Sequence, residues 1–219
     1  MLSFADDLNN HFEFELSDGD IVSGDLDLSF DNVISMFRHQ QGDELSDRGK
    51  LTVSLFLLTG DTCESLAEID QVNLLMYLVK EYVVRAKPVQ EALSQLEKPE
   101  DEKQFYSLVE DADYIYAAFM QDYRMDLFDQ RGKLHWQKFK ALLSGLRDDT
   151  KFKQVLQIRM WKPDKNTSAE EKERMEELQR FYALEISQEE LEFLAMSEEE
   201  KHEYAMKKWQ EEQEKSQKG

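Results

Sequence analysis

Helical spacing of apolar side chains in residues 104–160 constrains the fold more than any other feature of the chain. Within this stretch the runs 112–127, 136–146 and 152–156 repeat apolar residues at intervals of three and four, the spacing of one broad helix face. Gly132 separates the first two runs. Because the stretch is also rich in aromatic side chains, we expect three short helices that pack around one aromatic core.

Residues 12–30 carry the one clear β-strand signal of the chain. Apolar residues alternate with acidic or polar residues on both sides of the pair Asp18-Gly19, a pair that favours a tight hairpin turn. A hairpin alone is marginally stable in water. We therefore expect the apolar face of this hairpin to lie on the helices that follow.

Helical patterns occupy residues 31–83, where Gly42 and Gly60 end the first two. The third pattern begins at Ser65. Its hydroxyl and the carboxylate of Glu68 have the spacing of a capping box, in which each side chain accepts a hydrogen bond from a free amide at the helix start.

Apolar residues cover much of the circumference of this third helix. Ile69, Val72 and Met76 lie on its main stripe, and Leu74 and Leu78 widen the stripe. A helix with so much apolar surface is typical of the centre of a protein. We therefore predict that this helix is central to the core.

A different kind of sequence follows residues 161–168, which lose the helical spacing and collect Pro, Asp, Asn, Thr and Ser. Ser168, Ser187 and Ser197 each precede acidic residues and predict the starts of three helices. The apolar stripes of these helices are too narrow to be buried among themselves, so they need either the globular body or another chain as a cover. Both alternatives stay open. The candidate partner-binding residues, in these stripes and in the central aromatic cluster, are Trp136, Phe139, Met175, Leu178, Phe181, Leu191, Leu194, Tyr204 and Trp209.

The patterns together predict a mainly α fold. It consists of a multi-helix globular body of five to seven helices, a small N-terminal β-hairpin and a helical, acidic C-terminal extension. The expected parts are residues 1–30 for the docked hairpin, 31–162 for the helical core domain and 163–219 for the extension.

The charge balance excludes some partners. Lys and Arg number 27 and Asp and Glu number 47, which gives a formal net charge of −20. Neutralisation of phosphates by cationic side chains supplies most of the affinity for nucleic acids, so we expect no nucleic-acid partner. The simplest role of the charge is solubility. A specific acidic function such as mimicry of DNA is the less favoured alternative.

Residues 131–162 are locally basic within this acidic chain. They are consistent with a nucleic-acid patch or with a contact surface for the acidic face of a neighbouring copy or for the Glu-rich extension. The overall charge favours the second interpretation. If it holds, self-association should weaken as the salt concentration rises.

The sequence shows no pattern typical of an active site. Cys63 is the single cysteine, which excludes an internal disulfide and a zinc site with several thiolates. The four His residues stand far apart, and Asp111 and Asp113 are explained by helix capping more simply than by acid–base chemistry. Glycine-rich phosphate loops and nucleophile motifs are absent. We expect no enzymatic activity, no cofactor and no metal.

No membrane partner is expected either. The N-terminus lacks the basic and apolar regions of a signal peptide, and the longest apolar run, residues 53–58, is too short to cross a bilayer. These features indicate a cytoplasmic protein.

Three segments carry a resemblance to a known family: residues 111–119, 134–146 with the sequence LHWQKFKALLSGL, and 150–152. They resemble a small family of proteins from long-tailed phages and prophages of Gram-positive bacteria. Its members are encoded between the major tail protein and the tape-measure protein, the position of tail assembly chaperones. The resemblance extends from about Leu16 to Trp161.

The resemblance implies a tail assembly chaperone that binds the tape-measure protein and is displaced as the major tail protein polymerises. It further implies a location in the host bacterial cytoplasm and absence from the mature virion. The family offers no catalytic residues to carry over. A structural tail or virion component is the alternative function, and an acidic DNA-mimic inhibitor is a less favoured one. The major tail protein and a second copy of this chain are further candidate partners.

Overall fold

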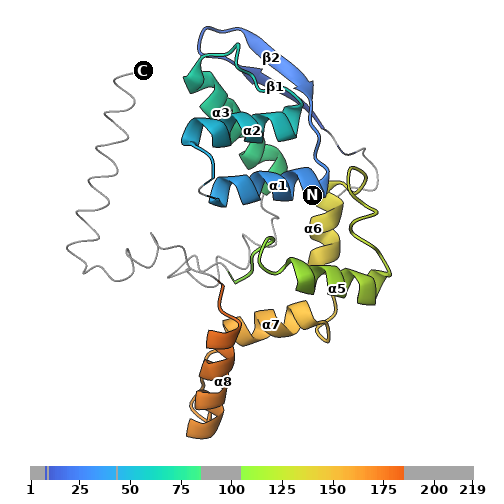
Figure 1. The fold of residues 1–219 in the computed structure, drawn as a ribbon, viewed down its shortest axis with the longest axis vertical. Coiled ribbons are helices and arrows are strands. Elements are labelled where there is room, and N and C mark those ends of the chain that lie inside the picture. Colours follow the sequence, from blue (N-terminus) through green and yellow to red (C-terminus); the bar gives the residue numbers. More distant parts are fainter. Residues whose placement is uncertain (1–7, 9, 43, 85–104, 185–219) are drawn as a thin grey trace, which may run out of the picture. The chain divides into compact units, whose positions relative to one another are not determined.

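The computed structural model describes residue 8 and residues 10–42, 44–84 and 105–184. These residues form a two-stranded sheet, seven α-helices and one π-helix (Figure 1), which confirms the mainly α fold with a small N-terminal hairpin. In chain order the elements are β1 (His11–Glu15), β2 (Ile21–Asp25), α1 (Phe30–Gln41), α2 (Asp47–Thr59), α3 (Glu68–Leu78), the π-helix η1 (Val79–Val84), α5 (Ala112–Tyr123), α6 (Trp136–Ser144), α7 (Lys151–Met160) and α8 (Ala169–Phe181).

The hairpin is docked on the helices, as expected. β1 and β2 pair antiparallel, and Gly19 adopts a left-handed φ of +89° in the turn between them, a conformation that costs other residues energy. Phe12 is buried with 4% of its surface exposed, and the ring of Phe14 lies 5.4 Å from that of Tyr77. The apolar face of the hairpin is thereby covered by residues at the end of α3.

The segment after β2 ties the N-terminal helices to α6. The backbone N–H of Trp136 donates to the Leu28 carbonyl at 2.7 Å, and the N–H of Phe30 donates to the Leu134 carbonyl at 2.9 Å. This short antiparallel bridge fixes the start of α1 beside the start of α6, and α1 packs on both α2 and α6.

An aromatic stack occupies the centre of the core. The Phe139 ring on α6 is fully buried and lies nearly parallel to the rings of Phe30, Phe119 and Trp136, with centroids 5.1, 5.4 and 5.5 Å away. The Trp136 indole N–H donates to the Val83 carbonyl at 2.9 Å. Aromatic pairs add stabilisation beyond their buried area, so α1, α5 and α6 meet at Phe139. The aromatic core predicted for residues 104–160 is thereby confirmed.

The serine signals for helix starts agree with the structure at Ser168 and differ from it at Ser65. Thr150 and Ser168 cap α7 and α8 with their hydroxyl groups. The predicted capping box at Ser65 is wrong, because α3 begins only at Glu68, behind Ala67, and has no side-chain cap. Residues 64–66 form a turn instead.

The chain divides into two compact units, Met1–Tyr182 and Ala183–Gly219, and all the described helices and strands belong to the first. This unit continues past residue 162, where the core domain was expected to end. The helices predicted after Ser187 and Ser197 lie outside the described residues.

α8 belongs to the first unit because it packs on α7. The Gln179 side-chain amide donates to the carbonyls of Ile158 and Trp161 at 3.0 and 2.8 Å. The Ile158 carbonyl also accepts the backbone N–H of Trp161, the C-cap residue of α7, at 3.2 Å. The first helix of the predicted extension is therefore part of the body.

Candidate protein-binding surface

Helix α3 has an apolar face on each side. Leu74 and Leu78 are fully buried, whereas Ile69 and Met76 are 60% and 65% exposed, and Val72 is 37% exposed. α3 therefore contributes to the core, as predicted, but Ile69, Val72 and Met76 on its main stripe are exposed. The residues that were expected only to widen the stripe form the buried face instead.

Two polar side chains decide which face of α3 is buried. Asp70 is 5% exposed and accepts hydrogen bonds from the backbone N–H and the hydroxyl of Ser17, both at 2.9 Å. Gln71 is 6% exposed and donates to the Leu66 carbonyl at 2.9 Å. Burial of a polar group without a partner is costly. Because both groups have partners on the inner side, the opposite side of α3 faces the solvent.

We call Ile69, Val72 and Met76 the α3 outer face. They are spaced three and four residues apart, so they lie on one side of the helix. Isolated exposed apolar residues are common on protein surfaces. Three in successive turns of one helix are less common and mark this face as a candidate binding surface.

Charged side chains lie at both ends of the α3 outer face. Asp61, Glu64 and Glu68 are exposed in the turn before α3 and in its first residue. Lys80 is exposed just after the helix. The end near the α3 N-terminus is therefore strongly negative.

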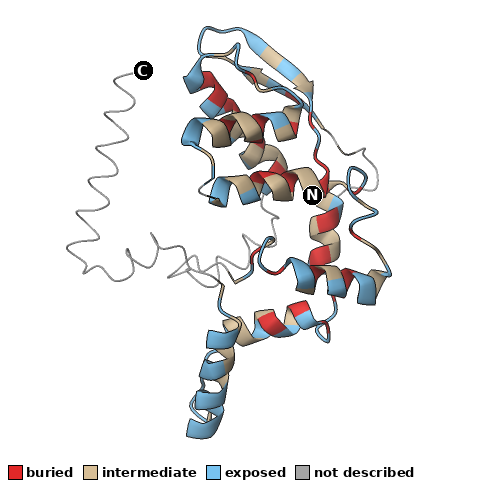
Figure 2. Ribbon diagram, viewed as in Figure 1, coloured by how far each residue is buried: buried red, intermediate tan, exposed pale blue. Residues whose placement is uncertain are grey.

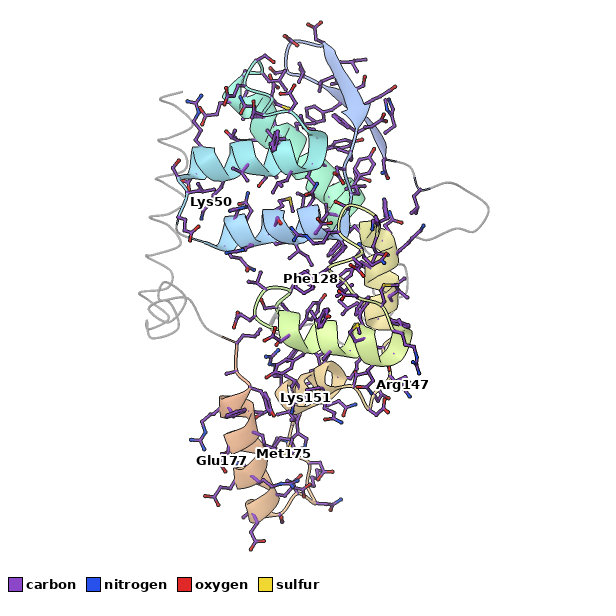
Figure 3. All side chains as sticks on the ribbon, turned by 45° about the vertical axis from the view of Figure 1, so that its right-hand side comes forward. Lys50, Phe128, Arg147, Lys151, Met175 and Glu177 are labelled. Carbon is purple, nitrogen blue, oxygen red and sulfur yellow. The ribbon has the colours of Figure 1, made fainter. Side chains whose placement is uncertain are left out.

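Helix α8 carries a second, weaker apolar stripe. Met175 and Leu178 are half-buried, and Phe181 is 77% exposed; α8 contains no buried residue (Figure 2). At the end of the helix the Lys151 ammonium group lies 4.5 Å from the centre of the Tyr182 ring, and Figure 3 labels Lys151 on α7 and Met175 on α8. Partner binding by Met175, Leu178 and Phe181 stays a prediction.

The two central aromatic residues proposed for partner binding do not lie on the surface. Trp136 and Phe139 are 4% and 0% exposed, and their rings fill the aromatic stack. A partner cannot contact them in this conformation, so their assignment as partner-binding residues is corrected to core packing. The remaining candidates lie outside the described residues: Leu191, Leu194, Tyr204 and Trp209.

Other exposed apolar residues stand apart in the sequence. Phe128, in the loop between α5 and α6 (Figure 3), is 69% exposed, and Ile21 on β2 is 70% exposed. Neither belongs to a run of exposed apolar residues at helical spacing, unlike the α3 outer face. Scattered residues of this kind need no functional explanation.

The locally basic region is partly neutralised within the chain. Arg147 Nε lies 2.8 Å from the Asp122 carboxylate, and hydrogen bonds, first of all from the Arg147 backbone N–H, lower the pKa of Asp122. Arg131 lies 3.8 Å from the Asp31 carboxylate. Less positive charge is therefore available to an external partner than the sequence suggested, and contact with another copy stays a prediction.

A buried ion pair joins α7 to the start of α5. Arg159 donates two hydrogen bonds to the Asp111 carboxylate at 2.7 and 2.8 Å, with 10% and 2% of the two side chains exposed. Arg159 also donates to the carbonyls of Phe105 and Tyr182 at 3.0 and 2.6 Å. Asp111 occupies the N-cap position of α5 as expected, but its side chain makes no cap bond. The capping role predicted for its carboxylate is therefore wrong, and the carboxylate serves tertiary structure.

His135 is a structural residue in its neutral form. Its Nδ1 accepts the Gln137 backbone N–H at 3.1 Å and caps α6; the proton is therefore on Nε2, which donates to the Asn10 side chain at 2.9 Å. Burial lowers the pKa of His135, and the charges of Lys138 and Lys140 lower it further. The neutral form is therefore the stable one at neutral pH.

The single cysteine, Cys63, is buried. Burial raises the pKa of the Cys63 thiol, and the Asp61 carboxylate adds to this effect, so the reactive thiolate is disfavoured. The described part of the chain holds no group of three His, Cys, Asp or Glu side chains placed to bind a metal ion. Within that same part, every helix is too short or too polar to cross a membrane.

Comparison with known proteins identifies the family. A family model described as Bacteriophage Gp15 protein matches residues 15–184, which is well over half of the chain and includes both α3 and α8. Searches of curated proteins and of solved structures found no match. The family match agrees with the resemblance to a phage protein family. The chain belongs to the Bacteriophage Gp15 protein family.

Proposed function

We propose that this protein is a tail assembly chaperone that binds the tape-measure protein of its phage in the host bacterial cytoplasm. Membership of a bacteriophage family supports a role in the phage life cycle, and the resemblance to proteins encoded beside the tape-measure protein supports the tail. The observation that carries the proposal is the α3 outer face, an exposed apolar helix face on a chain of net charge −20.

The affinity of one such contact is small. Full burial of a Val, Ile or Met side chain is worth about 1.5–3 kcal/mol, and the three side chains of the α3 outer face are 37–65% exposed. Covering them would contribute about 2–5 kcal/mol in total. Association itself costs several kcal/mol in lost translational and rotational freedom, so a single contact of this kind is weak and exchanges readily.

Weak contacts suit a chaperone that must dissociate from the tape-measure protein during tail assembly. Many copies along one long tape-measure chain would cover its apolar surface, and each copy could be displaced when the major tail protein polymerises around it. The acidic surfaces of neighbouring copies would repel other complexes and keep them dispersed. The proposed action is non-covalent and uses no cofactor.

Co-expression tests the proposal directly. The tape-measure protein of the same phage is produced with and without this chain, and its soluble fraction is measured. We expect the tape-measure protein to become soluble and to co-purify with this chain. An insoluble tape-measure protein in both cultures, with no co-purification, would contradict the proposed function.

A further inference from the structure

The α3 outer face is accessible and needs a partner of particular chemistry. Its three apolar residues lie around the exposed Asn73. The buried polar groups of α3, Asp70 and Gln71, have their hydrogen-bond partners on the inner side. A partner therefore gains affinity from apolar contact along about two helical turns. Another amphipathic helix provides that shape, since its own side chains recur at the same spacing.

The charges around the face select the partner. Asp61, Glu64 and Glu68 form a negative end, whereas the exposed Lys80 lies at the other end beside the half-buried Glu81. A second copy of this chain would bring another net charge of −20 to the contact, so repulsion disfavours self-association there. A partner with Lys or Arg at one end of its apolar stripe is attracted instead.

The remaining segments of this chain are poor occupants by the same criterion. Residues 185–219 contain eleven acidic and five basic residues, and residues 85–104 contain five acidic and four basic residues. Both segments carry the sign of charge that Asp61, Glu64 and Glu68 repel. The basic region 131–162 of a second copy is partly neutralised by ion pairs within its own chain, so we assign the complementary charge to a different protein.

We propose that the α3 outer face binds an amphipathic helix of the tape-measure protein whose apolar stripe ends in Lys or Arg residues, an assignment that rests on the proposed function. The cationic end of that helix lies against Asp61, Glu64 and Glu68. Cations are favoured at the C-terminal end of a helix and carboxylates at the N-terminal end, so the bound helix runs antiparallel to α3.

Binding to overlapping peptides tests this assignment. Labelled peptides that together cover the tape-measure protein of the same phage are titrated with the full-length chain, and fluorescence anisotropy gives Kd. The test variant is Ile69→Gln with Met76→Gln, because Gln keeps a high helix propensity. Phe128→Gln is the matched control, since Phe128 is as exposed as these residues and lies in a loop. Circular dichroism and size-exclusion chromatography confirm that each variant is folded.

We expect at least one amphipathic peptide to bind, and the double variant to weaken its binding at least about 30-fold, from the loss of two largely exposed side chains at the contact. Phe128→Gln should leave Kd unchanged. If the double variant binds the peptide as well as the wild type does, the assignment to α3 is overturned while the proposed function stands. If wild-type protein binds no peptide and also fails to keep the tape-measure protein soluble, the proposed function itself has failed.

Two further measurements test the cationic end of the partner helix and the alternative that the partner is a second copy. Glu64→Gln with Glu68→Gln should weaken binding at low salt and reduce its dependence on salt concentration; unchanged binding would refute the cationic end of the bound helix. Light scattering reports the oligomeric state. If the wild type self-associates and Ile69→Gln with Met76→Gln abolishes this while peptide binding persists, the occupant is a second copy and the proposal is wrong.

Discussion

Removal of the Asp111 carboxylate should strongly destabilise this protein. In the structure Asp111 and Arg159 form a two-point ion pair with 2% and 10% of their side chains exposed. Asp111→Ala leaves the guanidinium group buried with only the carbonyls of Phe105 and Tyr182 as partners. It also removes the acceptor of the Ser107 backbone N–H, which donates to Asp111 at 3.0 Å.

The size of the effect follows from the uncompensated charge. Removal of one partner from a buried ion pair typically costs about 3–5 kcal/mol, whereas replacement of both partners by apolar residues is often neutral. We therefore expect Asp111→Ala to lower the free energy of unfolding by about 3–5 kcal/mol. The double variant Asp111→Leu with Arg159→Met should lose clearly less than that.

Urea denaturation followed by far-ultraviolet circular dichroism measures both variants, with a common slope m as the check that the unfolding reaction is unchanged. The matched control is Lys172→Ala, which breaks an exposed pair with Glu176 on α8 and should cost less than about 1 kcal/mol. A loss below 1 kcal/mol for Asp111→Ala, or a double variant that is the least stable of all, would refute the assignment of this pair as a buried, coupled contact.

Three further predictions concern stability and use the same urea assay. The pKa of His135 is lowered in the folded state, so the unfolded state binds more protons as the pH falls. The stability that neutral His135 contributes is therefore complete above its unfolded pKa of about 6.5. This stability is lost as the pH falls through the folded pKa. The free energy of unfolding of the wild type should fall between pH 7.5 and pH 5.5. It should fall less in His135→Asn, which retains a capping acceptor. An equal fall in both proteins would contradict the prediction. Gly60→Ala should lower the free energy of unfolding by about 1–2 kcal/mol, because Gly60 has a left-handed φ of +76° that costs alanine energy. A steric clash adds nothing, since no atom lies within 4 Å of the added Cβ. An unchanged urea midpoint would count against that backbone conformation. Phe139→Ala should cost about 3–5 kcal/mol, and a loss as small as that of a surface substitution would show that the aromatic stack is not the centre of the core.

The elements of the fold could be predicted because their signals are local. The alternation around Gly19 and the spacing of apolar residues in 104–160 specify a hairpin and three helices from neighbouring residues alone. The cap at Ser168 acts within one turn of the chain. Such signals need no knowledge of the tertiary structure.

The orientation of α3 could not be predicted, because both of its faces are apolar and periodicity gives no preference between them. The contact that decides it joins Asp70 to Ser17, 53 residues away in the chain. The ion pair between Asp111 and Arg159 spans 48 residues. Sequence patterns report which residues can share a face, whereas tertiary contacts decide which face is covered.

The partner-binding assignment of Trp136 and Phe139 failed for a related reason. An aromatic cluster at helical spacing has the same composition whether it fills a core or forms an interface. In this protein the stack with Phe30 and Phe119 buries it. The surface that remains for a partner depends on which face of each helix is buried, and tertiary contacts decide that.

Quantitative mass spectrometry of tail-assembly intermediates and of finished virions from one phage culture tests the proposed chaperone role most directly. A protein that covers the tape-measure protein and then leaves should be abundant in the intermediates, at several copies per tape-measure chain, and absent from the virions. A constant ratio of this chain to the tape-measure protein in both samples would contradict the account and identify a structural component of the tail.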